Sequence, residues 1–143
     1  MLMFRIITKA LITKGNDVLI LKRNNTSFAA GYWDIPGGKL EFGESLQESL
    51  VREVNEETSL QIDLAGVIST SSGINSEKKK QYITVVYLCN YLSGEVVLSN
   101  EHSEYMWVNI RNLKQKNLVY YVEEAIDKII YSDLKNLKFK KAF

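Results

Sequence analysis

The chain has 143 residues, of which 45% are hydrophobic and 24% charged, the balance of a globular protein long enough to bury its own core. Its formal net charge of +1 gives no overall attraction to nucleic acid or anionic membrane, and no apolar run is long enough to span a bilayer. The single cysteine, Cys89, excludes an internal disulfide, and no signal-peptide pattern begins the chain, so we expect one cytoplasmic domain over residues 1–143.

Runs rich in β-branched and aromatic residues, separated by glycine-containing turns, recur along the chain and predict strands. In chain order these are residues 4–13, 18–23, 32–35, 62–71, 81–92, 96–98 and 105–110. Two helices are predicted, because residues 45–57 lack glycine and proline and apolar residues recur at helical spacing through residues 118–131. The combination predicts an α/β fold in which a mixed β-sheet is sandwiched between helices.

The first predicted helix, residues 45–57, carries an acidic face. Glu53, Glu56 and Glu57 lie at positions i, i+3 and i+4, so their carboxylates are neighbours and repel one another. A helix that keeps three such carboxylates is expected to bind a cation, and hard oxygen ligands favour Mg²⁺ or Mn²⁺ over zinc. The preceding loop, residues 37–43, contains three glycines and can bring its backbone close to a ligand.

An apolar stripe on the same helix, formed by Leu46, Leu50 and Val54, adjoins the acidic face. The glutamates are therefore expected at the rim of the packed interface, beside a cleft. Arg52 also lies beside this face, within helical reach of neighbouring glutamates or, if it folds back, of Glu44 in the loop.

The window from Gly38 to Leu60 resembles the Nudix box: glycine, five residues, Glu, seven residues, then Arg-Glu-apolar-x-Glu-Glu-x-Gly-apolar. Every fixed position matches except Ser59, which stands where the family has glycine. Residues 32–37 resemble the family's lead-in, and residues 101–108 resemble the segment that many members place over their metals. The chain is therefore identified as similar to MutT-like Nudix hydrolases, and the resemblance implies their α/β/α sandwich.

The resemblance implies which residues would bind Mg²⁺ or Mn²⁺. Glu53, Glu56 and Glu57 match the metal carboxylates, and the backbone carbonyl of Gly38 would join them. The implied reaction is hydrolysis of a P–O–P linkage, with Glu53 or Glu101 removing the proton of the attacking water. This makes Glu53 and Glu101 candidate catalytic residues.

The resemblance also implies a brace and several residues near the substrate. Glu44 and Arg52 match the pair that braces the loop against the helix, and Arg52 is counted among the catalytic residues. Arg23 and Lys39 are candidates for binding a substrate phosphate. The role given to Glu101 stays open to two neighbours, Glu104 and His102, of which His102 is expected to be an exposed loop residue.

Ser59 is the one departure from the box. Past a helix end the chain often turns through positive φ, which favours glycine, and serine takes that conformation at a cost of about 1 kcal/mol. We therefore expect a strained helix end and an intact site.

The substrate is expected to be a small nucleotide: a (d)NTP first, with ADP-ribose or another nucleotide sugar as the alternative. Many ADP-ribose hydrolases have a proline about fifteen residues after the box, where this chain has Asn75 and Ser76. A non-catalytic nucleotide sensor and an RNA 5′-end hydrolase are rival functions, but no box acid is lost and the charge is near neutral. No membrane or stable nucleic-acid partner is expected, and a homodimer is left open. Aromatic residues that would stack on a base or else pack in the core are Phe28, Trp33 and Tyr82.

Overall fold

The computed structural model describes residues 1–24 and 29–141, with residues 131–141 as backbone only, so Phe28 lies outside the described residues. The elements are the strands β1 (Met3–Lys14), β2 (Asp17–Arg23), β3 (Trp33–Asp34), β4 (Gly37–Lys39), β5 (Gln61–Asn75), β6 (Lys80–Ser93) and β7 (His102–Asn109), the 3₁₀ helix η1 (Ile110–Gln115), and the helices α1 (Leu46–Thr58) and α2 (Tyr120–Lys141).

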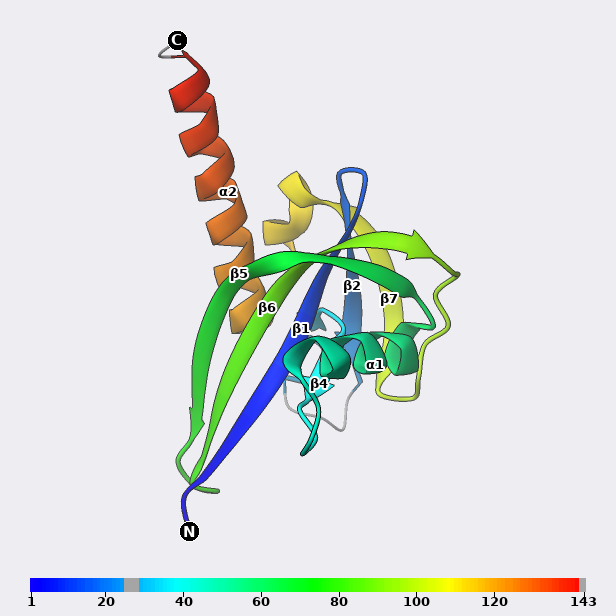
Figure 1. Ribbon diagram of the computed structural model, residues 1–143, viewed down its shortest axis with the longest axis vertical. Coiled ribbons are helices and arrows are strands. Elements are labelled where there is room, and N and C mark those ends of the chain that lie inside the picture. Colours follow the sequence, from blue (N-terminus) through cyan, green and yellow to red (C-terminus); the bar gives the residue numbers. More distant parts are fainter. Residues whose placement is uncertain (25–28, 142–143) are drawn as a thin grey trace.

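Seven strands of the described chain form one mixed sheet between two helices (Figure 1). The order is β3-β2-β1-β6-β5, with β4 beside β1 and β7 beside β2. β1 and β6 run parallel, whereas the other strand pairs are antiparallel. The predicted mixed sheet sandwiched between helices is therefore confirmed.

Successive side chains of a strand point to opposite faces of the sheet, so each face has its own hydrophobic core. Leu11 and Ile20 point into the core beneath α2, while Ile12 and Leu21 point into the core beneath α1. On α1, Leu50 and Val54 are fully buried in that second core, as the apolar stripe predicted. Cys89 is buried there as well.

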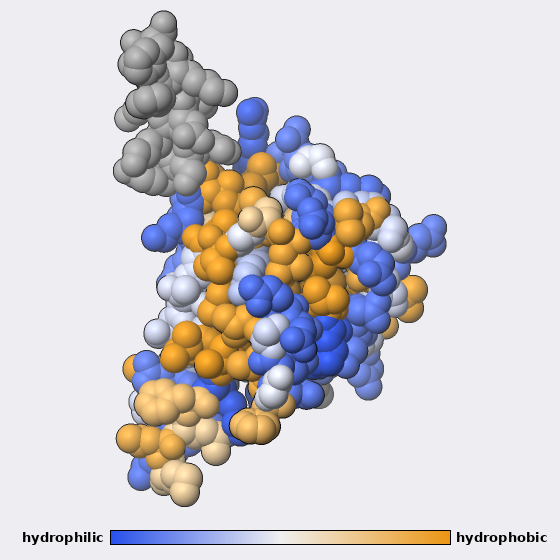
Figure 2. Space-filling view, viewed as in Figure 1, coloured by the Kyte–Doolittle hydropathy of each residue, from blue (hydrophilic) through white to orange (hydrophobic). Residues whose placement is uncertain are grey.

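Helix α1 covers only part of its side of the sheet. Figure 2 shows a broad apolar area on the face that carries α1. Phe4, Ile6 and Ile74, which lie toward the ends of β1 and β5, are exposed large hydrophobic residues. None of the helices in the described part of the chain is long and apolar enough to cross a bilayer.

The ends of α1 follow from its sequence. Ser45 caps the first turn, where its hydroxyl accepts the Glu48 N–H at 3.1 Å. At the other end Ser59 has φ 65° and ψ 12°, and its N–H donates to the Asn55 carbonyl at 2.8 Å. The predicted left-handed turn at Ser59 is therefore confirmed.

Two local predictions were wrong. Residues 96–98 do not form a strand, because the Val97 N–H donates to the Thr58 carbonyl of α1 at 3.0 Å while Val96 and Leu98 pack in the core beneath α1. Residues 37–39, the start of the predicted loop over residues 37–43, form the short strand β4, which pairs with β1 at Lys9↔Gly37.

Candidate active site

A cleft of about 1130 Å³ opens where β4, α1 and the start of β7 meet. It extends past the paired ends of β5 and β6 to the first residues of α2. The sequence-predicted site residues that line it are Arg23, Gly38, Lys39, Glu53, Glu57 and Glu101. Three others, Glu44, Arg52 and Glu56, are not among the lining residues but belong to the same cluster through the ion pairs of Arg52.

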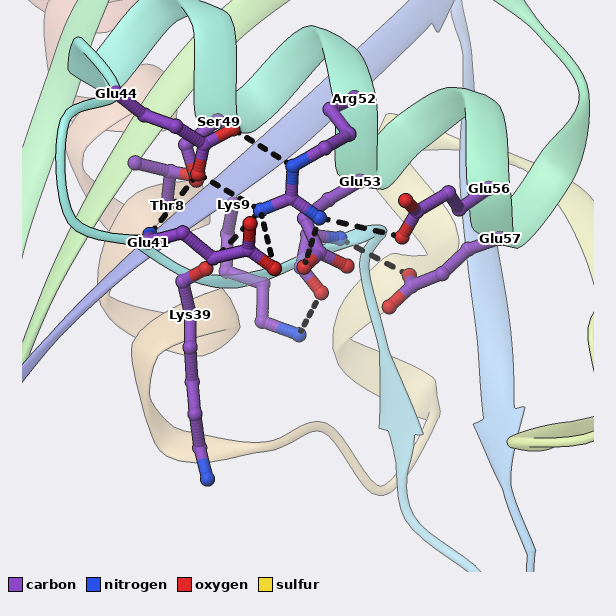
Figure 3. A network of polar contacts seen from close by, with 11 residues as sticks. Thr8, Lys9, Lys39, Glu41, Glu44, Ser49, Arg52, Glu53, Glu56 and Glu57 are labelled. Carbon is purple, nitrogen blue, oxygen red and sulfur yellow. Dashed lines mark hydrogen bonds and ion pairs between the residues drawn. The ribbon is translucent and has the colours of Figure 1, made fainter.

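Arg52 is the centre of a network of ion pairs on α1 (Figure 3). Its guanidinium binds Glu44 through two bonds, Nε to Oε2 at 2.7 Å and Nη2 to Oε1 at 2.9 Å. Its Nη1 also donates to Glu53 Oε1 at 3.0 Å and to Glu56 Oε2 at 3.3 Å. The hydrogen bonds from Arg52 lower the pKa of Glu44 to about 2. The loop–helix contact that a brace requires is therefore present.

Glu57 is held apart from Arg52, on the sheet side of α1. Its side chain is 4% exposed, and its Oε2 accepts the Gly37 N–H at 3.1 Å. Burial raises the pKa of Glu57 to about 8, and the positive charge of Lys9 opposes part of that rise. Burial also raises the pKa of Glu53, against the opposing effect of Arg52.

The two glycines of β4, Gly37 and Gly38, lie close to other parts of the protein. A Cβ on Gly38 would lie 2.5 Å from the Glu53 carboxyl carbon, so a side chain there would displace Glu53. A Cβ on Gly37 would lie 2.0 Å from the Thr8 carbonyl oxygen. The contact at Gly37 is with backbone, so close packing requires glycine there, whereas glycine at position 38 leaves the Glu53 carboxylate in its place.

The carboxylates predicted to bind a metal ion do not converge on one point. Among the described residues no three His, Cys, Asp or Glu side chains form a group that could hold a metal ion. Instead, Arg52 draws the carboxylates of Glu53 and Glu56 toward itself. The oxygens of Glu53, Glu57 and the Gly38 backbone are nevertheless the hard donors that suit Mg²⁺ or Mn²⁺.

Glu101 and Glu104, the two acids of residues 101–108, lie in different surroundings. Glu101 is exposed and lines the cleft, and its negative charge contributes to the raised pKa values of Glu53 and Glu57. Glu104 lies in β7, where its carboxylate is 3.9 Å from the Lys22 ammonium. The segment thus brings Glu101, and not Glu104, to the box acids.

His102 was predicted to be an exposed loop residue, which is wrong. It begins β7 and is 6% exposed, and its Nδ1 is buried with no hydrogen-bond partner among the described residues. Burial and the charge of Lys9 lower its pKa to about 4, so the imidazole is neutral at pH 7. No local pattern predicts this burial, because only pairing with β2 makes His102 part of the sheet.

The two residues predicted to bind phosphate differ in their surroundings. Arg23 Nη1 lies 2.7 Å from the buried Asp34 carboxylate, so its charge is shared with that group. Lys39 extends away from the acidic cluster (Figure 3). Of the stacking candidates, Trp33 is in the core beneath α2 and Tyr82 lines the cleft.

The sequence reasoning missed a buried polar cluster under the cleft. Asp34 is fully buried and accepts hydrogen bonds from Lys9 Nζ at 3.2 Å and from the Tyr121 hydroxyl at 2.6 Å. Burial alone would raise the pKa of Asp34, but Lys9, Tyr121 and Arg23 hold it below its ordinary value. The available signal was a lysine in the middle of an apolar strand.

Comparisons with known proteins agree on one family. The model of the NUDIX domain matches residues 3–129. The ADP-ribose pyrophosphatase of Methanocaldococcus jannaschii is 30% identical over 103 residues, which are 72% of this chain and 60% of that protein. The nucleoside triphosphatase NudI of Escherichia coli K12 is 32% identical over 100 residues, which are 64% of this chain and 67% of NudI. The crystal structure of the MutT protein from Methanosarcina mazei superimposes with a TM-score of 0.82 at 31% identity, covering 92% of this chain and 96% of that one.

Proposed function

The chain belongs to the NUDIX family, and from this premise we propose that it hydrolyses the diphosphate linkage of a nucleoside di- or triphosphate derivative. The observation that carries the proposal is the row of carboxylates on α1 beside the glycines of β4, with Glu53 and Glu57 facing a cleft. The volume of about 1130 Å³ is at the upper end of what small-molecule sites offer and leaves room for a nucleotide. Because the chain spans 60% of the length of the archaeal relative, its activity is inferred from its own site.

The site residues divide the work between binding and proton transfer. Glu53, Glu57 and the Gly38 carbonyl would hold Mg²⁺ or Mn²⁺, with Glu56 joining them if Arg52 releases it. The bound cation supplies positive charge to the phosphate oxygens and acidifies a water molecule. Glu101 lines the cleft and is our candidate for the base that removes the proton of that water.

Positive charge on the cleft wall favours a substrate with several phosphates. Besides Lys9, the basic residues that line the cleft are Arg5, Arg23, Lys39 and Lys78. Four carboxylates, those of Glu41, Glu53, Glu57 and Glu101, line the same cleft, so the basic residues offer local contacts for phosphate groups and not a net positive field. We therefore propose a (d)NTP as the substrate, in agreement with the similarity to a protein named nucleoside triphosphatase.

A nucleotide sugar is the second candidate. Its support is the similarity to a protein named ADP-ribose pyrophosphatase, which is 30% identical to this chain. A non-catalytic sensor is disfavoured because all of the box carboxylates are present.

A panel of (d)NTPs, ADP-ribose and other nucleotide sugars, each incubated with Mg²⁺ and analysed by mass spectrometry, tests the proposal. Conversion of a (d)NTP to its monophosphate and pyrophosphate is the expected result. Conversion of ADP-ribose alone would select the second candidate. Binding of nucleotides without any turnover would identify a sensor and overturn the proposed hydrolysis.

A further inference from the structure

A buried lysine lies beside β4, at the part of the cleft lined by Glu53 and Glu57. Lys9, in the middle of β1, is 5% exposed. Its Nζ donates to Asp34 Oδ2 at 3.2 Å and to the backbone carbonyls of Ile35 and Gly37, each at 3.3 Å. The ammonium has three N–H groups and three acceptors, so its hydrogen bonding is complete. Such pairing is what allows a charge to remain buried.

The position of Lys9 is fixed from the other side by Asp34. That carboxylate also accepts hydrogen bonds from Arg23 Nη1 at 2.7 Å, the Tyr121 hydroxyl at 2.6 Å and the Ile35 N–H at 2.7 Å. These donors come from β2, α2 and the segment after β3. Asp34 therefore ties Lys9 to three separate parts of the fold.

From Lys9 a chain of hydrogen bonds leads to Glu57 through one residue. The Gly37 carbonyl accepts a hydrogen bond from the Lys9 ammonium, and the Gly37 backbone N–H donates to Glu57 Oε2 at 3.1 Å. Gly37 packs directly on β1, since a Cβ there would lie 2.0 Å from the Thr8 carbonyl oxygen. Loss of the Lys9 ammonium would remove the hydrogen bond to the Gly37 carbonyl, and with it one restraint on the residue whose amide holds Glu57.

Two basic side chains, Arg52 from α1 and Lys9 from β1, influence the acidic cluster. Arg52 binds Glu44, Glu53 and Glu56 from α1. Glu57 instead receives the Gly37 N–H and the electrostatic influence of Lys9. Figure 3 shows that Lys9 and Arg52 reach the cluster from different elements.

We propose that Lys9, held by Asp34, is a positioning residue that holds the Gly37 backbone at the start of β4 so that Glu57 is placed to bind the divalent cation. This inference rests on the proposed function, in which Glu57 is a metal ligand. Lys9 acts through Gly37 and touches neither the cation nor the substrate, since its donors are all used within the protein.

The test is Mn²⁺ binding, measured by electron paramagnetic resonance of the free ion, in the parent and in Lys9→Met. Methionine fills similar volume without charge or donors. We expect Mn²⁺ binding to weaken by about tenfold or more, the usual effect of removing a residue that orients a metal ligand. The matched control is Lys22→Met, because Lys22 is a partly exposed lysine on the next strand whose contacts are a surface ion pair with Glu104 and the ring of Trp33. Its Mn²⁺ affinity should equal that of the parent.

A second readout is solvent exchange of the Gly37 amide proton, followed by NMR without metal. The amide should be protected in the parent and exchange faster in Lys9→Met. Unchanged Mn²⁺ affinity in a folded Lys9→Met protein would overturn the proposal, as would an unprotected Gly37 amide in the parent. If Lys9→Met does not fold, Asp34→Asn, which keeps Lys9 and removes its anionic partner, should show the same two effects.

These outcomes separate the two proposals. A parent protein that binds no Mn²⁺ and hydrolyses no nucleotide would refute the proposed function. The exchange rates of the Gly37 amide would still show whether Lys9 holds the Gly37 backbone. Conversely, a parent that binds Mn²⁺ and is active, with Lys9→Met binding Mn²⁺ equally well, would refute only the role of Lys9.

Discussion

Replacing Ser59 by glycine should leave the protein equally stable or make it more stable. Ser59 ends α1 at φ 65°, and it is exposed, so its side chain contributes little packing. Relieving left-handed strain at a residue with a Cβ gains about 1–2 kcal/mol, from which the greater freedom of glycine in the unfolded chain removes about 0.4–1 kcal/mol. The free energy of unfolding should therefore be unchanged or rise by up to about 1.6 kcal/mol, which raises the melting temperature by a few degrees.

Thermal unfolding of Ser59→Gly and Ser59→Ala, followed by circular dichroism, separates the two contributions. Alanine removes the hydroxyl but keeps the Cβ in the left-handed conformation, so its melting temperature should stay close to that of the parent. A clear fall in the melting temperature of Ser59→Gly would refute the reasoning. It would mean that the Ser59 hydroxyl stabilises the helix end more than the strain destabilises it.

Two further predictions concern the acids of the cleft. Glu101→Gln should lower kcat more than Glu104→Gln and should alter the acid limb of the pH profile, because Glu101 lines the cleft while Glu104 pairs with Lys22; greater damage from Glu104→Gln would exchange their roles. Metal-free protein should lose stability as the pH rises from 6.5 to 8. In this range Glu57, with its pKa raised to about 8, binds more protons in the folded than in the unfolded state. His102, with its pKa lowered to about 4, makes stability rise with pH instead, but only up to about pH 6.5. Melting temperatures should show that fall and show Mg²⁺ stabilising more at pH 8 than at pH 6.5, and a parent whose profile matches that of Glu57→Gln would contradict the assignment.

Local patterns were enough to predict the acidic helix. Glu53, Glu56 and Glu57 share a face because the helical repeat places them there, and the same repeat buries Leu50 and Val54. The left-handed turn at Ser59 also follows from its place one residue beyond the helix. Membership of the family, indicated by the spacing of these residues, is confirmed by the domain match over residues 3–129.

The rest of the site depends on contacts between distant parts of the chain. Lys9 meets Asp34 across 25 positions, and Asp34 meets Tyr121 across 87. No periodicity within one segment reports such pairs, so the buried cluster was missed and His102 was misjudged. The sequence of residues 96–98 is typical of a strand, but Val96 and Leu98 pack in the core beneath α1, and the Val97 N–H donates to the Thr58 carbonyl at the end of α1.

The most direct test of the central claim is the initial rate of nucleotide hydrolysis by chelator-treated protein before and after Mg²⁺ is restored. It uses the nucleotide that the panel identifies, with the parent and Glu57→Gln compared at each Mg²⁺ concentration. We predict no turnover in excess chelator, full recovery with Mg²⁺ or Mn²⁺, and a loss of about 10²-fold or more in kcat for Glu57→Gln, whose fold should be unchanged. Full activity in excess chelator, or a Glu57→Gln protein as active as the parent, would contradict the assignment of these carboxylates to a metal-dependent hydrolase.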